Sequence, residues 1–251
     1  MPTYPSPTSI TTLQEGSLTL HGEFMWGSNY TYLAQVEYKG EKLGVVYKPT
    51  KGVRPLWDFP SASLARREVA AYLVSEALGW ELVPPSVYRK DAPLGPGSLQ
   101  LYIEHNPEYH YFNFSPEDRQ RLRPTSLFDL ILNNADRKGS HILLDDDRHI
   151  WLIDHGICFH IDDKLRTVVW DFAGEKIPDR LLADMKRFRD KLDLPDKPRP
   201  EGEKPDLWRS LGQYINHSEI GALARRTERI LSSGCFPNPD SSRRQYPWPP
   251  V

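Results

Sequence analysis

Two aspartates that lie eighteen positions apart constrain the fold of this chain more than any other feature of its sequence. Asp136 and Asp154 each end a short apolar run, and the segment between them is typical of a tight hairpin. A phosphotransferase needs carboxylates held in this way. Asp136 would receive the proton of an attacking hydroxyl group, and Asp154 would hold the magnesium that neutralises the transferring phosphates.

The residues before this segment predict a small antiparallel sheet with one helix packed on it. Ser17–Glu23 and Tyr30–Tyr38 alternate apolar and polar residues, and Lys42–Pro49 is a third strand that ends at a proline. Ser61–Leu78 changes to a helical pattern, with an apolar stripe and Gly79 placed to end the helix. Two further short strands complete the predicted sheet: Leu82–Tyr88 and Ser98–Ile103.

The residues after this sheet predict a mainly helical second half. Its expected helices begin at Ser115 and then cover Thr125–Asn134, Pro178–Leu192, about Asp206–Ile215, and Ser218–Ser232. The sequence therefore predicts an α+β fold of two lobes, a small antiparallel-sheet lobe and a mainly helical one. The expected boundaries are an N-terminal arm at 1–14, the first lobe at 15–103, the second lobe at 104–235 and a disordered, proline-rich tail at 236–251.

Composition excludes several classes of protein. The chain has 32 basic and 34 acidic residues, so a broad basic surface for nucleic acid is not expected. Its two cysteines, Cys158 and Cys235, lie far apart and predict neither a disulfide framework nor a zinc site. The first residues lack the pattern of a signal peptide, and no apolar run approaches the length of a membrane span. We therefore expect a cytoplasmic protein without integral membrane association.

Other residues suit a phosphate-binding site together with the two aspartates. The turn Met25–Asn29 offers backbone N–H groups and the Ser28 hydroxyl as hydrogen-bond donors. Lys48 ends the third predicted strand, where its ammonium group reaches phosphates. Glu68 follows twenty residues later on the predicted helix and pairs with Lys48, which limits the side-chain entropy that the lysine loses on binding. Asp129, on the helix before Asp136, is expected to brace the loop.

The order of these motifs resembles a known superfamily. Val-Val-Tyr-Lys48, Arg-Glu68, Asn-Ala-Asp136-Arg137 and Ile-Asp154-His-Gly156 resemble the atypical kinase fold of phosphatidylinositol 3-/4-kinases, HipA-like kinases and secretory-pathway casein kinases. The runs Trp26–Asn29, Arg54–Pro60, Leu132–Gly139 and Asp154–His160 are similar to a bacterial family of uncharacterised proteins labelled phosphatidylinositol 3-/4-kinase-like. The resemblance extends over about residues 15 to 235.

The resemblance implies a role for each part of the predicted site. It implies ATP and Mg²⁺ as cofactors, Asp136 as the catalytic aspartate, Asp154 as the magnesium ligand, and Lys48, held by Glu68, as the nucleotide lysine. Ser28 and Asn29 belong to the turn that closes over the phosphates. The connection between the lobes that would contact adenine comprises Gln100, Leu101, Tyr102 and Ile103.

One residue departs from the superfamily pattern. His141 stands where phosphatidylinositol kinases have a metal-binding asparagine. A neutral histidine is a poor ligand for magnesium, which prefers oxygen, so a site with a single metal or with Mn²⁺ is an alternative. Arg137 is expected to contact either phosphate or the acidic residues of its own lobe.

Several activities are compatible with these residues. The leading hypothesis is an ATP- and Mg²⁺-dependent kinase that phosphorylates a hydroxyl group of a lipid, a protein or a small molecule. The alternatives are a nucleotide-binding pseudokinase without catalysis and an enzyme that transfers AMP on the same fold. A metallohydrolase built on His141, His155, His160 and Asp154 is the weakest alternative, because it leaves the predicted sheet lobe without a role.

Overall fold

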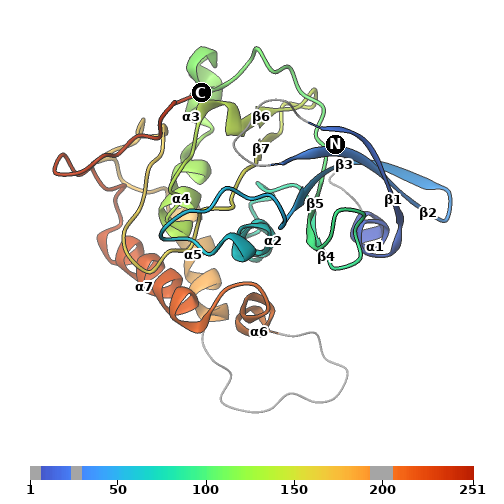
Figure 1. Ribbon diagram of the computed structural model, residues 1–251. Coiled ribbons are helices and arrows are strands. Elements are labelled where there is room, and N and C mark those ends of the chain that lie inside the picture. The colour runs from blue at the N-terminus through green and yellow to red at the C-terminus, as the bar shows by residue number, and fades with distance from the viewer. Residues whose placement is uncertain (1–6, 24–29, 193–205) are drawn as a thin grey trace.

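The antiparallel sheet forms the first half of the molecule. The structure is a computed structural model that describes residues 7–23, 30–192 and 206–251 (Figure 1). The sheet in these residues has five strands in the order β1-β2-β3-β5-β4, and neighbouring strands are antiparallel. The strands are β1 (Ser17–Glu23), β2 (Tyr32–Tyr38), β3 (Glu41–Pro49), β4 (Ser86–Arg89) and β5 (Gly97–Leu101).

Helix α2 (Leu64–Leu78) is the element that joins the sheet to the rest of the molecule. A short 3₁₀ turn, Ser61–Ser63, precedes it, and Gly79 ends it with a left-handed φ of 71° that a residue with a Cβ adopts less readily. The helix contacts β4 and β5 on one side and helices of the second half on the other. Because both sides are covered, even Glu68 is only 3% exposed.

Residues 7–15 form a helix where the sequence predicts an arm. Helix α1 (Pro7–Glu15) packs against β2, β3, β4 and β5, and its Leu13 is fully buried. The following Gly16 lies so close to the sheet that an added Cβ would stand 2.3 Å from Val36 Cγ1. The helix is short, and Leu13 is the one apolar side chain fully buried among those that the structure describes in it, so its sequence shows no helical stripe long enough to recognise.

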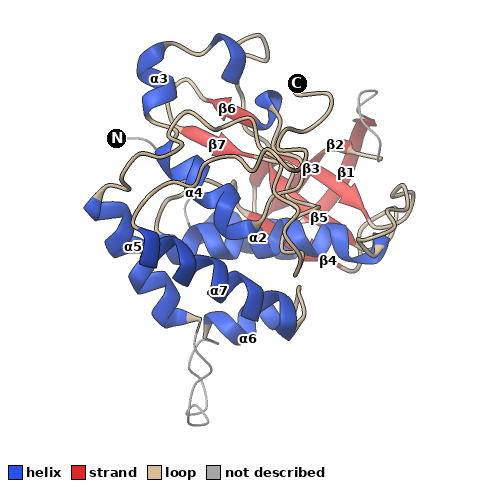
Figure 2. Cartoon of the chain, turned by 90° about the vertical axis from the view of Figure 1, so that its left-hand side faces the viewer, coloured by secondary structure: helices blue, strands red, loops and turns tan. Residues whose placement is uncertain are grey.

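Helices dominate the second half of the chain. They are α3 (Pro116–Gln120), α4 (Arg123–Leu132), α5 (Asp179–Lys191), α6 (Leu207–Gly212) and α7 (His217–Ser233), with two 3₁₀ turns at Tyr111–Asn113 and Gly139–His141. The hairpin of β6 (Ile142–Leu144) and β7 (Ile150–Leu152) lies between α4 and α5 in the chain. Figure 2 shows α5, α6 and α7 gathered on the side away from β1 and β2. No helix of the described residues is long and apolar enough to cross a membrane.

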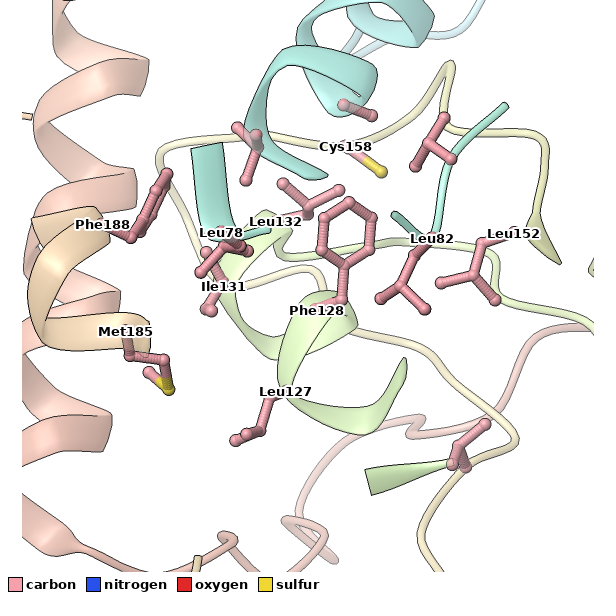
Figure 3. Close-up of a cluster of buried hydrophobic side chains, with 14 of the residues drawn as sticks. Leu78, Leu82, Leu127, Phe128, Ile131, Leu132, Leu152, Cys158, Met185 and Phe188 are labelled. Carbon is pink, nitrogen blue, oxygen red and sulfur yellow. The ribbon is translucent and has the colours of Figure 1, made fainter. Parts of the chain in front are cut away.

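The main hydrophobic core joins α2 to this helical half. Its centre is drawn in Figure 3, where Phe128 and Leu132 of α4 lie close to Leu82 and Leu152. Phe188 of α5 packs at the left-hand side of this cluster in Figure 3. The core therefore holds α4, the β6–β7 hairpin and α2 in fixed relative positions, and the two predicted aspartates follow α4 and β7.

The last residues differ from the expected disordered tail. Phe236 and Gln245 are buried, with exposed fractions of 2% and 6%. The backbone N–H of Thr167 donates to the Gln245 carbonyl at 3.0 Å, and that of Gly139 donates to the Pro250 carbonyl at 2.8 Å. Proline-rich composition indicates a segment without its own helix or strand, but here the neighbouring loops supply its hydrogen-bond partners.

Candidate active site

A cleft of about 580 Å³ lies between the sheet half and the helical half. The residues that line it include Val46 and Lys48 of β3, Glu68 of α2, and Asp136 and Asp154 of the helical half. Deep clefts with an apolar lining and a few polar groups are the usual form of small-molecule sites. The predicted lysine, glutamate and aspartates therefore meet in one cavity.

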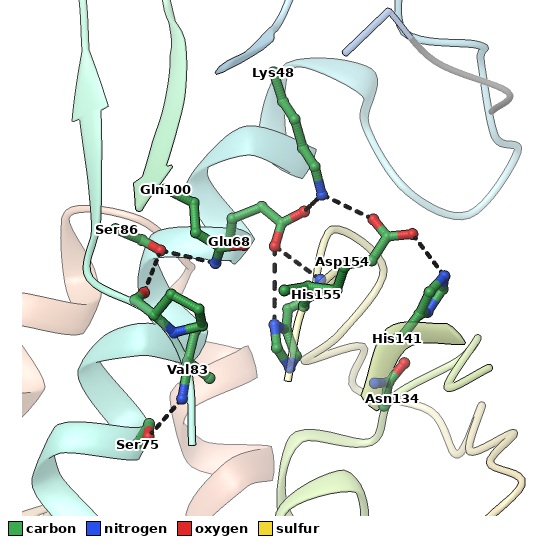
Figure 4. A network of polar contacts seen from close by, with 12 residues as sticks. Lys48, Glu68, Ser75, Val83, Ser86, Gln100, Asn134, His141, Asp154 and His155 are labelled. Carbon is green, nitrogen blue, oxygen red and sulfur yellow. Dashed lines mark hydrogen bonds and ion pairs between the residues drawn. The ribbon is translucent and has the colours of Figure 1, made fainter. Parts of the chain in front are cut away.

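Lys48 makes the central contact between the two halves. Its Nζ lies 2.6 Å from Glu68 Oε1 and 3.0 Å from Asp154 Oδ1 (Figure 4). Burial lowers the pKa of Lys48, but the carboxylates of Asp154 and Glu68 outweigh burial, so the pKa is raised overall. The lysine is therefore charged and held in one position, as the expected pairing with Glu68 requires.

Glu68 is buried, and both of its carboxylate oxygens accept hydrogen bonds. One oxygen accepts from Lys48, and Oε2 accepts from the backbone N–H of His155 at 2.8 Å. A buried carboxylate is stable only with such partners. The helix α2 thus contacts the loop after β7 directly. Two hydrogen bonds link the sheet half to this loop, one from Lys48 to Asp154 and one from the His155 backbone N–H to Glu68.

The backbone turns sharply at Asp154, two residues after strand β7 ends. Its φ of 63° lies in the left-handed region, which is uncommon for a residue other than glycine and often marks functional sites. Oδ1 faces Lys48, and Oδ2 lies 3.3 Å from His141 Nε2. The Lys48 charge is the main reason that the pKa of Asp154 is lowered, so this carboxylate stays ionised.

Asp136 lies in a different electrostatic environment. Burial raises its pKa to about 6, and the negative charge of Asp154 adds to this effect, while Lys138 opposes it. The Lys138 Nζ is 3.6 Å from Asp136 Oδ2, and the Asp136 backbone N–H donates to Asn134 Oδ1 at 3.0 Å. Two carboxylates with separated pKa values are a common arrangement for acid–base chemistry, and the weaker acid, Asp136, is suited to accept a proton.

Arg137 fixes the loop between α4 and the β6–β7 hairpin from the interior of the protein. Its side chain is fully buried and donates to both oxygens of Asp129, at 3.0 and 3.2 Å. It also donates to the carbonyls of His141 and Ile153 and to Nε2 of His155. Of the two expected roles for Arg137, the structure shows the contact with an acid of its own lobe, and Asp129 braces the loop as expected.

His141 lies beside Asp154 but is oriented as a hydrogen-bond donor. Burial lowers its pKa to about 4, so the ring is neutral at pH 7. The backbone N–H of Lys138 points to His141 Nδ1 at 3.5 Å, which leaves the ring proton on Nε2, facing Asp154 Oδ2. In this orientation the imidazole N–H faces the Asp154 carboxylate and stabilises its charge.

The donor set suits a metal that is shared with a ligand. No group of three or more His, Cys, Asp or Glu side chains within the described ranges is placed to hold a metal ion alone. Magnesium in nucleotide sites takes one or two carboxylates and completes its shell with phosphate oxygens and water. The Asp154 side chain, 49% exposed in the cleft, fits that role.

The predicted connection between the lobes also lines the cleft. Gln100, Leu101, Tyr102 and Ile103 all contact the cavity. The buried Gln100 amide donates to Ser86 Oγ at 2.9 Å, so this side chain is occupied by the sheet and only the segment after it is available to a ligand. Ser28 and Asn29, predicted to close over phosphates, lie outside the described residues.

One residue of the cleft was not assigned a role from the sequence. Arg166 lines the cavity, and its backbone makes hydrogen bonds with Asn134 and Arg137, at 2.8 and 2.9 Å. His155, which the sequence placed only in the metallohydrolase alternative, is fully buried and is not among the residues that line the cleft. Arg166 lies about thirty residues after Asp136 in an irregular segment, so no periodic pattern could have indicated its position.

Comparison with known proteins identifies the family of this chain. Residues 58–195, more than half of the sequence, match the family model for phosphatidylinositol 3- and 4-kinase. The chain belongs to the phosphatidylinositol 3- and 4-kinase family. Protein Rv2133c of Mycobacterium tuberculosis is 37% identical over 272 residues, which cover 94% of this chain and 93% of that protein. The family membership expected from the motifs is confirmed.

Two solved structures are similar over most of the chain. The Helicobacter pylori proinflammatory kinase CtkA superposes with a TM-score of 0.50 at 10% identity, covering 89% of this chain and 94% of CtkA. Fam20 from hydra, solved with a sugar, has a TM-score of 0.47 at 14% identity and covers 91% and 89% of the two chains. The likeness to CtkA confirms the predicted kinase-like α+β fold.

Proposed function

We propose that this protein is a kinase that uses ATP and a divalent metal ion to phosphorylate a hydroxyl group. The observation that carries the proposal is the meeting of Lys48 and Glu68 with Asp136 and Asp154 in one cleft. Phosphoryl transfer depends mainly on positioning and on neutralising charge, so these four side chains provide the parts that the reaction needs. The acceptor is a hydroxyl of a lipid, a protein or a small molecule.

The sheet half and α2 position the nucleotide in this proposal. The charged Lys48, held by Glu68, binds the α- and β-phosphates, and the segment from Leu101 to Ile103 contacts the adenine ring. Because Lys48 is already ordered in the free protein, it loses little side-chain entropy when the phosphates bind.

The helical half carries the chemistry. Asp154 would hold the metal, which supplies charge neutralisation at the phosphates when it is bound. Asp136 accepts the proton of the acceptor hydroxyl, and Lys138, 3.6 Å away, stabilises the transferring phosphoryl group. The loop keeps this geometry because Arg137 fixes it to Asp129.

The test of the proposed function is transfer of labelled phosphate. The purified chain is incubated with γ-labelled ATP, Mg²⁺ or Mn²⁺, and separate sets of lipids, proteins and hydroxyl metabolites, with Asp154→Asn as the blank. ADP release and labelled acceptor that both depend on Asp154 support the proposal. Nucleotide binding without ADP release indicates a pseudokinase, and an adenylate adduct detected by mass spectrometry indicates AMP transfer.

The pH dependence of transfer will report on Asp136. Because its pKa is raised to about 6, the base is ionised above that pH and becomes protonated as the pH falls through about 6. The rate should therefore be constant near pH 8 and fall about tenfold for each pH unit below 6. Lys138→Met removes the cation that lowers this pKa, so its midpoint should lie at a higher pH. A midpoint that stays unchanged in this variant contradicts the assignment of Asp136.

The metal preference will depend on His141. Replacing it with asparagine supplies an amide oxygen, which magnesium prefers to an imidazole nitrogen. We expect His141→Asn to raise the ratio of Mg²⁺- to Mn²⁺-supported transfer by about tenfold, the scale on which changes around a metal site alter activity. His149→Asn, in the β6–β7 hairpin, is the matched control. Equal ratios in the wild type and both variants would show that His141 does not influence the metal.

A further inference from the structure

We infer that His155 is a positioning residue that connects the loop bearing Asp136 to the Lys48–Glu68 pair, and thereby sets the affinity of the cleft for nucleotide. The inference about affinity rests on the proposed function, whereas the hydrogen-bonding state of His155 does not. His155 follows Asp154 directly in the chain, and its ring is fully buried. It contacts Phe128 edge-on, with 5.7 Å between the ring centroids.

The contact with Arg137 decides which ring nitrogen of His155 carries the proton. His155 Nε2 lies 2.7 Å from Arg137 Nη2. A guanidinium group has only donors, so Nε2 must be the unprotonated acceptor. A neutral imidazole keeps one proton, which must therefore be on Nδ1. Arg137 is itself fixed by the fully buried Asp129. The ion pair of Arg137 with Asp129 therefore determines the orientation of the His155 ring.

The protonated nitrogen of His155 faces the sheet half of the molecule. Nδ1 has no hydrogen-bond partner among the described residues, and its nearest carboxylate oxygen, Glu68 Oε2, is 3.9 Å away. The same oxygen already accepts from the His155 backbone N–H, as Figure 4 shows. A separation of 3.9 Å is too long for a hydrogen bond, so the ring N–H and the Glu68 carboxylate interact electrostatically, and the water-poor interior strengthens that attraction.

These contacts form a continuous chain between the two halves. It runs from Asp129 through Arg137 and His155 to Glu68, and from there to Lys48. Polar contacts in a buried chain support each other, so the position of Lys48 depends on the loop that holds Asp136. A phenylalanine at this position would fill the same space and keep the backbone N–H that Glu68 accepts, but it would leave Arg137 Nη2 without its acceptor and remove the ring N–H that faces Glu68.

The first test measures the hydrogen-bonding state directly and needs no activity. The ring nitrogens are observed by NMR in protein labelled with ¹⁵N-histidine, and the His155 signals are assigned by their loss in His155→Phe. We expect a neutral ring with the proton on Nδ1. A proton on Nε2, or on both nitrogens, overturns the proposed chain, because neither state can accept from Arg137.

The second test measures ATP binding by calorimetry with Mn²⁺ present. We expect His155→Phe to raise the dissociation constant about tenfold, while His155→Gln, which carries both an acceptor and a donor, restores part of the affinity. His149→Phe is the control, because this histidine lies in the β6–β7 hairpin and contacts Glu81 and Trp151 rather than the cleft. Thermal unfolding of each variant shows whether it remains folded.

The outcomes separate this inference from the proposed function. If the wild type does not bind ATP, the proposed function is overturned and the role of His155 in affinity falls with it. If the wild type binds ATP and both His155 variants bind equally well, only the inference is overturned. Should His155→Phe fail to fold, the His155 signals are assigned with His155→Gln, and the ring proton of the wild type decides: a proton on Nδ1 supports the proposed chain, and a proton on Nε2 or on both nitrogens overturns it.

Discussion

Asp136→Ala will lower the rate of phosphoryl transfer by about 10²- to 10⁴-fold, the range expected when a general base is removed. The reason is local. Asp136 is the carboxylate in the cleft whose pKa is raised to about 6, whereas the pKa of Asp154 is lowered by Lys48. After the substitution no side chain at that position accepts the hydroxyl proton. The measurement is the turnover number at saturating ATP, pH 8.

Two further measurements make this result specific to Asp136. The dissociation constant for ATP should change little, because Lys48 and Asp154 remain in place. Asp146→Ala removes an exposed carboxylate in the turn between β6 and β7 and should leave turnover unchanged. If Asp136→Ala keeps full turnover, Asp136 is not the general base and another residue must accept the proton.

Asp129→Ala will destabilise the folded protein by about 3–5 kcal/mol, because it leaves a buried arginine without its counter-charge. Asp129 and Arg137 both have side chains with 0% exposure, and they are 3.0 Å apart at their closest atoms. The Asp129 carboxylate also accepts from Asn134 and Thr167, and both of these donors would lose their partner. The measurement is the free energy of unfolding in urea.

An exposed ion pair provides the control for this substitution. Asp163 pairs with Arg243 at 2.6 Å, but their side chains are 48% and 35% exposed. Solvent screens such a pair, so Asp163→Ala should cost no more than about 1 kcal/mol. If the two substitutions lower the free energy of unfolding equally, the Asp129–Arg137 contact does not stabilise the loop.

Parts of this structure follow from local patterns in the sequence. The alternation in Ser17–Glu23 predicts β1 with the same bounds, and Gly79 ends the predicted helix where α2 ends. The pairing of Lys48 with Glu68 also follows from their order and elements, and the structure shows it at 2.6 Å. Strand alternation and helix caps are local properties, so neighbouring residues suffice to predict them.

Other parts could not be predicted in this way. The helix α1 shows one fully buried apolar residue, Leu13, among its described side chains, and it packs against the sheet. The last residues have the composition of a disordered tail, yet Gln245 is buried against Thr167. In both segments, order depends on contacts with residues far away in the chain, and composition alone carries no information about those contacts.

Asp136 and Asp154 show the same difference between what the sequence predicts and what the fold decides. The sequence by itself determined that Asp136 and Asp154 end two apolar runs and that a lysine and a glutamate precede them in the order of a kinase-like family. Only the tertiary structure decided that the two carboxylates differ in pKa, because burial and the distance to Lys48 depend on packing. It also decided that His155 faces Glu68. Electrostatic interactions act through space, so their strength follows from the folded arrangement and not from spacing along the chain.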